Sequence, residues 1–273
     1  MKIIRFEDAE GRVGLGRAKD EGMQEAERLE GDLFGPLRPT GETVAVRRLL
    51  APLDPPNLLC IGLNYRQHAE ESHMDIPKRP VLFLKATTAV TGPDAPVVLP
   101  ALSYQVDWEG ELAVVIGKVA RDVAEADALD HVLGYACAND VSARDWQLQL
   151  DKQWARGKSF DGFCPLGPAL VTADEVGDPG ALPIRTRVNG ITMQDSSTSD
   201  LIFSVPRLIA YLSQGMTLLP GTVILTGTPS GVGMGRNPPR FLRPGDVCEV
   251  EIEGVGTLRT PFVADDAGRA AAA

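Results

Sequence analysis

Residues 107–117 read Asp107-Trp-Glu-Gly-Glu-Leu-Ala-Val-Val-Ile-Gly117 and predict a buried strand that carries two carboxylates. Alternate side chains of a strand face the same way, so Glu109 and Glu111 share one face, while the opposite face is apolar. Burying two neighbouring carboxylates is costly unless a cation or a proton neutralises them. Taken alone, the pair fits either a cation site or the solvated start of a strand. Asp107 has the same parity, but it lies at the entry of the strand, where we expect solvent to satisfy it.

A third carboxylate, Asp140, follows the apolar run of residues 132–138 and precedes a predicted helix. That helix is expected to run from Ser142, its N-cap, to Arg156, with Gly157 after its C-terminus. Asp140 is then either a ligand presented at a strand-to-helix junction or an ordinary turn aspartate near a helix N-terminus. Three carboxylates without a histidine or cysteine beside them form an oxygen-only site, which suits Mg²⁺, Mn²⁺ or Ca²⁺ better than zinc.

A lysine and a histidine are the candidate catalytic groups outside this cluster. Lys158 follows the predicted helix and is either a surface lysine or one that points into a cleft. A capping box of Asn64 and Gln67 would open a short helix, on which His68 and Glu71 can form a His–carboxylate pair three residues apart. The alternative for this pair is an exposed helix face. Of the three histidines only His68 has such a partner, which makes it the best candidate for a general base.

The glycine-rich segment 225–235 follows a predicted strand but does not match a nucleotide-binding loop. It lacks the G-K-[ST] sequence, and G-x-G-x-x-G fails because Arg236 occupies the place of the last glycine. We expect instead that its backbone N–H groups and Thr228 face a carboxylate.

Short apolar runs separated by turn residues predict a strand-rich chain. Helices are fewer, and a second one is expected over residues 204–214. Many strands with scattered helices favour a β-rich α+β fold over a βαβ sheet. The expected strands of the main body span residues 58–63, 81–84, 111–117, 169–172, 184–188, 222–226 and 247–253.

The breaker cluster Leu53-Asp-Pro-Pro-Asn57 predicts a domain boundary. Before it, a hairpin over residues 2–18 and a surface helix over residues 21–30 would form a small α+β appendage. An alanine-rich tail is expected to be frayed. The chain is therefore expected to divide into residues 1–52, residues 57–263 and residues 264–273.

Charge and composition exclude several classes of protein. The chain has 273 residues and a formal net charge of −10, which disfavours nucleic-acid and anionic-membrane partners because both need a basic surface. No charge-free apolar stretch approaches the roughly 18 residues of a membrane span, and the first eight residues contain no apolar signal region. We therefore expect a soluble, cytoplasmic protein.

The motifs, taken together and in order, resemble those of the fumarylacetoacetate hydrolase family over residues 58–263. Each motif is weak alone, whereas the ordered set is highly specific. Within the family, residues 106–109, 141–147 and 163–171 are most similar to the branch of fumarylacetoacetate hydrolase domain-containing protein 2. The motifs are Gly62-Leu-Asn-Tyr-Arg-Gln-His68, Trp108-Glu-Gly-Glu111, Asn139-Asp-Val-Ser-Ala-Arg-Asp145, Lys158-Ser-Phe-Asp161, Thr226-Gly-Thr-Pro-Ser-Gly-Val-Gly233 and Arg243-Pro-Gly-Asp246.

The resemblance implies a fold and a set of site residues. The fold would be a mixed β-sandwich roll, usually assembled as a homodimer. Glu109, Glu111 and Asp140 would hold Mg²⁺ or Mn²⁺. His68 and Glu71 would form a water-activating pair on a segment that acts as a lid in relatives, and Lys158 would face the substrate as a further catalytic group. The residues expected to contact the substrate are Gln147, Arg144 and Thr228.

The resemblance also implies a metal-dependent enzyme that acts on a small 2-oxo or 1,3-dicarbonyl acid. The metal would stabilise an enolate at C3, from which three reactions can proceed. Hydrolysis of a C–C bond is the leading expectation, with water activated by His68 and the oxyanion stabilised by Lys158 and Gln147. Tautomerisation of oxaloacetate and decarboxylation are the alternatives at the same site. A more distant alternative is a non-catalytic protein that a metal stabilises.

Overall fold

The computed structural model describes residues 1–265. The tail expected over residues 264–273 lies outside the described residues except for Ala264, which ends the last strand, and Asp265. No helix among the described residues has the length and apolar character needed to cross a membrane.

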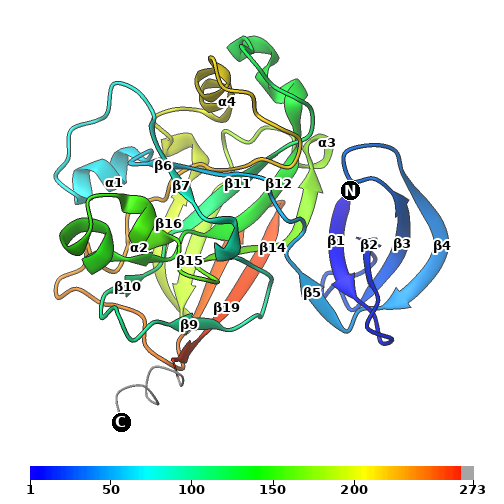
Figure 1. The fold of residues 1–273 in the computed structure, drawn as a ribbon, viewed down its shortest axis with the longest axis horizontal. Coiled ribbons are helices and arrows are strands. Elements are labelled where there is room, and N and C mark those ends of the chain that lie inside the picture. Colours follow the sequence, from blue (N-terminus) through cyan, green and yellow to red (C-terminus); the bar gives the residue numbers. More distant parts are fainter. Residues whose placement is uncertain (266–273) are drawn as a thin grey trace.

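The largest sheet runs through most of the molecule (Figure 1). Ten strands follow the order β4-β3-β2-β1-β14-β12-β11-β17-β6-β7, while β5 pairs with β1 and β8 pairs with β14. Most neighbours are antiparallel, but β17 pairs with β6 in parallel, so the sheet is mixed. The strands are β1 (Lys2–Glu7), β2 (Val13–Ala18), β3 (Glu25–Gly31), β4 (Leu37–Ala45), β5 (Arg48–Leu50), β6 (Leu58–Gly62), β7 (Val81–Lys85), β8 (Val90–Thr91), β11 (Gly110–Ile116), β12 (Val132–Asn139), β14 (Cys164–Thr172) and β17 (Val223–Leu225).

A second sheet packs against β11, β12 and β14 of the first, and the core lies between the two. Its order is β16-β15-β18-β19-β9, and a separate two-stranded sheet joins β10 to β13. Side chains such as Leu112, Cys248 and Phe262 are fully buried in this core. The architecture confirms the expected β-rich α+β fold and every strand expected in the main body. The strands are β9 (Val97–Leu99), β10 (Val106–Asp107), β13 (Ser142–Ala143), β15 (Pro183–Val188), β16 (Ile191–Ser197), β18 (Val247–Ile252) and β19 (Gly256–Ala264).

The helices are short, and two of them border the site. Figure 1 shows α1 (Arg66–Glu71) and α2 (Trp154–Lys158) on the side of the molecule opposite β1–β5. Ser204 is the N-cap of helix α4 (Val205–Ser213), and its hydroxyl accepts a bond from the backbone N–H of Arg207, so the helix expected over residues 204–214 is confirmed. The remaining helical segments are η1 (Thr87–Ala89), η2 (Glu125–His131), η3 (Trp146–Leu150), α3 (Ala173–Val176) and η4 (Thr198–Asp200).

The surface helix expected over residues 21–30 is wrong, because residues 25–31 form strand β3. The strand pairs with β2 on one side and with β4 on the other. Ion pairs from Arg17 to Glu27 and from Arg28 to Glu42 cross these pairings, so a charged stretch fits a sheet whose outer strands are exposed. All the regular elements of residues 1–52 are strands, and β1 extends the main sheet by pairing with β14.

The single helix expected from Ser142 to Arg156 is also wrong. Ser142 belongs to β13, and its hydroxyl donates to the backbone oxygen of Asp140 instead of capping a helix. The helical residues form two pieces, the π-helix η3 and the α-helix α2. Gly157 lies inside α2, where a Cβ would be only 2.5 Å from the backbone nitrogen of Gln147. Close packing of the two pieces therefore requires this glycine.

Candidate metal and active site

Strand pairing brings the three predicted ligands together. Glu111 lies on β11, Glu109 immediately precedes this strand, and Asp140 follows the end of β12. The antiparallel register pairs Gly110 with Asn139, so the backbone N–H of Asp140 donates to the backbone oxygen of Glu109 at 2.8 Å. One oxygen from each of the three buried carboxylates lies within 4.8 Å of the other two. The carboxylates thus form a cluster and not a solvated strand end.

Lys158 lies inside this acidic cluster. Its Nζ donates to Glu109 Oε2 at 2.8 Å, to Asp140 Oδ2 at 2.8 Å and to the hydroxyl of Ser142 at 2.7 Å. The ammonium also lies 5.0 Å from the centre of the Phe83 ring, within the range of a cation–π contact. Lys158 is therefore not a surface lysine, and the structure supports the alternative prediction that it points into a cleft.

A second buried lysine, Lys85 at the end of β7, was not foreseen from the sequence. Its Nζ forms an ion pair with Asp140 and donates to the backbone oxygens of Val141 at 3.1 Å and Phe163 at 2.8 Å. Asp140 is therefore held between two ammonium groups, from Lys85 and Lys158. The available signal was a lysine that directly follows the apolar run Val81-Leu-Phe-Leu84.

Asp107 is fully buried, so the expectation that solvent satisfies it is wrong. Its carboxylate accepts bonds from the backbone N–H groups of Trp108, Gly233 and Met234 and from Nε of Arg144. The protein itself thus supplies every partner that solvent was expected to provide.

Arg144 links Asp107 to the cluster. Its Nη1 lies 2.6 Å from Glu109 Oε1 and donates to Gln147 Oε1 at 3.0 Å. Arg144 is buried, and ionic partners on two sides raise its pKa although burial alone would lower it. Arg144 therefore orients Glu109, and its role as a substrate contact remains a prediction.

The electrostatics leave the cluster short of positive charge. Together with Asp107, the three carboxylates of the cluster make four buried acidic groups. Only three buried cations, those of Lys85, Arg144 and Lys158, lie beside them. Burial alone would raise the pKa of Glu109, but the charges of Lys158 and Arg144 hold it below its usual range. Burial raises the pKa of Glu111 well above its usual range, and the neighbouring carboxylates of Asp140 and Glu109 raise it further.

A divalent cation fits this imbalance. The donors are all carboxylate oxygens, as Mg²⁺ and Mn²⁺ prefer, and Glu109 and Asp140 are already oriented to share a positive charge. Glu111 accepts one backbone N–H, from Gly227 at 2.6 Å, and no lysine or arginine of the described residues forms an ion pair with it. Glu109, Glu111 and Asp140 are the residues that would hold the ion.

The histidine–carboxylate pair is formed as expected. On helix α1, His68 Nδ1 lies 2.9 Å from Glu71 Oε2, and Glu71 Oε1 accepts the backbone N–H of Gly231 at 2.8 Å. The capping box is wrong, because Tyr65 is the N-cap and no side chain caps the helix. Asn64 instead bonds through its side chain to backbone groups of residues 203 and 226, which ties the start of α1 to two distant segments.

The glycine-rich segment does donate to carboxylates, but they are the protein's own. Backbone N–H groups of residues 227, 231 and 233 donate to Glu111, Glu71 and Asp107, respectively. The Thr228 hydroxyl donates to the backbone oxygen of Gly110 and accepts a bond from Gln194, a buried amide that no sequence motif indicated. This segment therefore orients the acidic side chains of the site.

One cavity of about 350 Å³ collects nearly all the predicted residues. Of the predicted site residues only Asp140, which is fully buried, is absent from its lining. The predicted residues that line the cavity are His68, Glu71, Glu109, Glu111, Arg144, Gln147, Lys158 and Thr228.

The fold and the site define an enzyme built around a buried carboxylate cluster. A family model described as fumarylacetoacetate (FAA) hydrolase C-terminal matches residues 57–263, and the chain therefore belongs to the fumarylacetoacetate hydrolase family. The resemblance seen in the sequence motifs is confirmed. A second family model, described as Rv2993c-like, N-terminal, matches residues 1–52.

Two relatives share the name oxaloacetate tautomerase and are described as mitochondrial. The protein of Xenopus laevis is 51% identical over 79% of this chain and 68% of its own length, and that of Homo sapiens is 51% identical over 77% of this chain and 67% of its own length. These names favour the alternative reaction over the C–C hydrolysis expected first. The cytoplasmic location remains a prediction.

Solved structures match over nearly the whole chain. A 2-hydroxyhepta-2,4-diene-1,7-dioate isomerase from Mycobacterium marinum is 40% identical with a TM-score of 0.85, covering 97% of this chain and 99% of that one. A fumarylacetoacetate hydrolase from Exiguobacterium antarcticum is 40% identical with a TM-score of 0.82, covering 97% of this chain and 100% of that one. The likeness extends through the N-terminal strands as well as the main body.

Proposed function

We propose that this chain is a divalent-metal-dependent tautomerase that interconverts the keto and enol forms of oxaloacetate. The observation that carries the proposal is the buried cluster of Glu109, Glu111 and Asp140 with Lys158 inside it, open to a cavity of about 350 Å³. The names of the relatives support this substrate and this reaction. A homodimeric assembly, implied by the resemblance, remains part of the proposal.

The residues of the cavity suit a reaction that moves one proton. A divalent ion held by the three carboxylates would act as a Lewis acid toward the carboxylate and 2-oxo oxygens of the substrate. Lys158 is placed to hold or move a proton at the substrate, because its Nζ lies beside two of the three carboxylates and lines the cavity. A keto–enol exchange removes a proton from C3 and adds one at oxygen, so it needs no activated water.

The direct test follows the decay of enol-oxaloacetate by ultraviolet absorbance with the purified full-length chain. We expect acceleration in Mg²⁺ or Mn²⁺, complete loss of the acceleration after chelation, and its recovery when the metal is restored. Full activity in the presence of excess chelator would contradict the metal dependence. No acceleration under any condition would contradict the tautomerase itself.

Hydrolysis of a C–C bond is the second candidate, and the intact His68–Glu71 pair favours it. The pair lines the same cavity as Lys158, and Glu71 is held by Gly231 as well as by His68. A histidine oriented by a carboxylate is the usual arrangement for activating water. A panel of acylpyruvates, assayed beside oxaloacetate, tests this alternative.

His68→Ala distinguishes the two reactions. For a tautomerase that moves its proton through Lys158, we expect the variant to lower kcat for oxaloacetate by less than about 10-fold, whereas hydrolysis of an acylpyruvate would lose about 100-fold or more, the usual effect of removing a general base. Steady-state kinetics on both substrates measures this difference, with His73→Ala, at an exposed histidine, as the matched control. A loss of 100-fold or more with oxaloacetate would make His68 the proton carrier instead of Lys158.

A further inference from the structure

A closed ring of three hydrogen bonds joins the strand of the acidic cluster to the glycine-rich segment. The backbone N–H of Gly110 donates to Gln194 Oε1 at 2.9 Å, and Gln194 Nε2 donates to the Thr228 hydroxyl at 2.8 Å. This hydroxyl closes the ring by donating to the backbone oxygen of Gly110 at 3.0 Å. Gly110 lies between Glu109 and Glu111, so the ring is directly beside two of the predicted metal ligands.

The direction of each bond in the ring is fixed by groups that can act in only one way. A backbone N–H can only donate, so the bond from Gly110 identifies the amide oxygen of Gln194. A backbone oxygen can only accept, and that of Pro229 receives a bond from Gln194 Nε2 at 2.8 Å. The other hydrogen of the amide is donated to Thr228. The hydrogen of the Thr228 hydroxyl is therefore the one that bonds to Gly110.

The ring decides what the Thr228 hydroxyl can offer to a ligand. A hydroxyl has one hydrogen to donate and two lone pairs that accept. The hydrogen bonds to Gly110 and one lone pair accepts from Gln194, which leaves a single lone pair. Turning the hydrogen toward a ligand would take this donor from a buried backbone oxygen, which is unfavourable. Toward a ligand the hydroxyl is thus an acceptor, and the expectation that it faces a carboxylate is wrong.

Close packing of the second sheet against Gly110 holds the amide in place. Gln194 lies on β16 and is 1% exposed. A Cβ on Gly110 would lie 2.1 Å from the hydroxyl oxygen of Thr186 on β15 and 3.3 Å from Gln194 Oε1. A glycine between the two glutamates is therefore required for β15 and β16 to approach this strand. Packing and three hydrogen bonds together fix the orientation of the amide.

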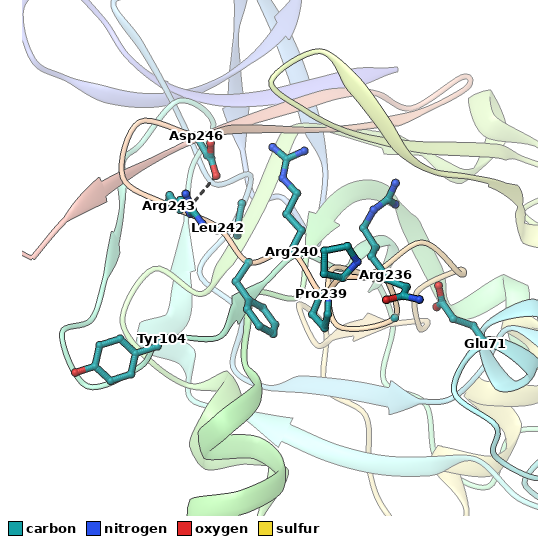
Figure 2. A pocket seen from close by; sticks show the side chains of 12 residues that line it. Glu71, Tyr104, Arg236, Pro239, Arg240, Leu242, Arg243 and Asp246 are labelled. Atoms are coloured by element: carbon teal, nitrogen blue, oxygen red, sulfur yellow. Dashed lines mark hydrogen bonds between the residues drawn. The ribbon is translucent and has the colours of Figure 1, made fainter.

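Thr228 lines the cavity that holds the acidic cluster. A neighbouring cavity of about 940 Å³ is drawn in Figure 2, with Glu71 at one end. The two cavities share only Glu71 and Gly235 in their linings, and Thr228 does not line the larger one. The Thr228 hydroxyl is therefore available to a ligand that lies beside the cluster.

We propose that Gln194 is a positioning residue that fixes the Thr228 hydroxyl as an acceptor, so that Thr228 selects the enol form of the substrate. The keto form of oxaloacetate, with both carboxylates ionised at neutral pH, has no hydrogen on any oxygen. The enol form has one, on the hydroxyl at C2, and only this form can donate a bond to Thr228. The proposal rests on the proposed function in one respect, namely that the cavity receives oxaloacetate.

The test compares two stable four-carbon diacids that differ in one atom group. (S)-Malate has a hydroxyl at C2, and (S)-2-fluorosuccinate has a fluorine there, which cannot donate a hydrogen bond. Isothermal titration of the full-length chain in MgCl₂ gives the ratio of their dissociation constants. Wild-type chain is expected to bind malate more tightly, and in Thr228→Val the ratio is expected to fall by at least about 3-fold, the effect of one neutral hydrogen bond.

Three further variants separate polarity from structural damage. Thr228→Ser keeps the hydroxyl and is expected to keep the ratio. Gln194→Met is expected to lower the ratio, because the hydroxyl is then free to donate to ligand carboxylates and fluorosuccinate gains relative to malate. Thr192→Val, at an exposed threonine on the same strand as Gln194, is the matched control and is expected to keep the full ratio. If Gln194→Met does not fold, the comparison of valine and serine at position 228 still tests the acceptor role.

Three results would overturn the proposal. An equal loss of affinity for both ligands in Thr228→Val would show that the hydroxyl donates to a carboxylate. An unchanged ratio in that variant would show that the ligand hydroxyl lies elsewhere in the cavity. An unchanged ratio in folded Gln194→Met would show that the amide does not set the polarity of Thr228. Because affinity is measured directly, a failure to turn over oxaloacetate contradicts the proposed function and leaves this comparison intact.

Discussion

Glu111→Gln is expected to lower metal-dependent turnover of oxaloacetate by more than about 100-fold. Even the loss of a group that only orients a metal ligand lowers metal affinity or activity by about 10- to 100-fold. Glu111 is the one carboxylate of the cluster without a lysine or arginine partner among the described residues, so the bound cation would be its principal counter-charge. Glutamine keeps an oxygen that can accept the N–H of Gly227, but it does not carry the charge. Titration with Mn²⁺ measures the expected loss of metal affinity, and steady-state kinetics measures the loss of turnover.

The matched control is Glu253→Gln, the same change at an exposed glutamate. It is expected to retain wild-type metal affinity and activity. The melting temperature of metal-free Glu111→Gln should not fall, because the substitution removes a carboxyl group whose charged form is disfavoured by burial and by two neighbouring carboxylates. Normal metal affinity in a folded Glu111→Gln protein would show that the carboxylates were wrongly assigned.

Asp107→Ala is expected to destabilise the fold by about 3–5 kcal/mol, the usual cost of breaking a buried ion pair from one side. The substitution leaves the buried Nε of Arg144 and three backbone N–H groups without their acceptor. At about 2–4 °C per kcal/mol for a chain of this size, the melting temperature should fall by roughly 6–20 °C.

Thermal unfolding followed by circular dichroism checks this prediction. Asp130→Ala, at an exposed aspartate in η2, is the control and is expected to change stability by less than about 0.5 kcal/mol. A change of similar size in both variants would mean that the network around Asp107 adds little to stability.

Local sequence patterns predict most of the site because its residues lie on strands and helices in which side chains that share a face recur at a fixed spacing. The two-residue period of the stretch 107–117 was enough to place Glu109 and Glu111 on one face. The three-residue spacing of His68 and Glu71 was enough to pair them. Where a side chain's partners lie within a few positions along the chain, spacing alone predicts the contact.

The parts that were missed depend on partners far away in the sequence. Asp107 looked exposed because two of the N–H groups that satisfy it lie at Gly233 and Met234, on a different loop. Lys85 looked like an ordinary strand end because its partner, Asp140, is brought to it only by the fold. Strand β3 looked helical because its spacing of apolar residues is shifted by a bulge between Glu27 and Leu29.

The pairing of β1 with β14 has a consequence for how copies of the protein behave toward one another. Without β1, residues 170–171 of the almost wholly buried strand β14 would expose unpaired backbone groups, the kind of apolar edge that recruits strands from other molecules. The N-terminal strands move this edge of the sheet from β14 to β4, which is exposed along nearly its whole length and contains Arg38, Pro39 and Glu42. Charges and a proline on an edge strand oppose further pairing. The N-terminal strands thus replace an apolar edge of the sheet by one whose charges and proline disfavour pairing with another copy of the chain.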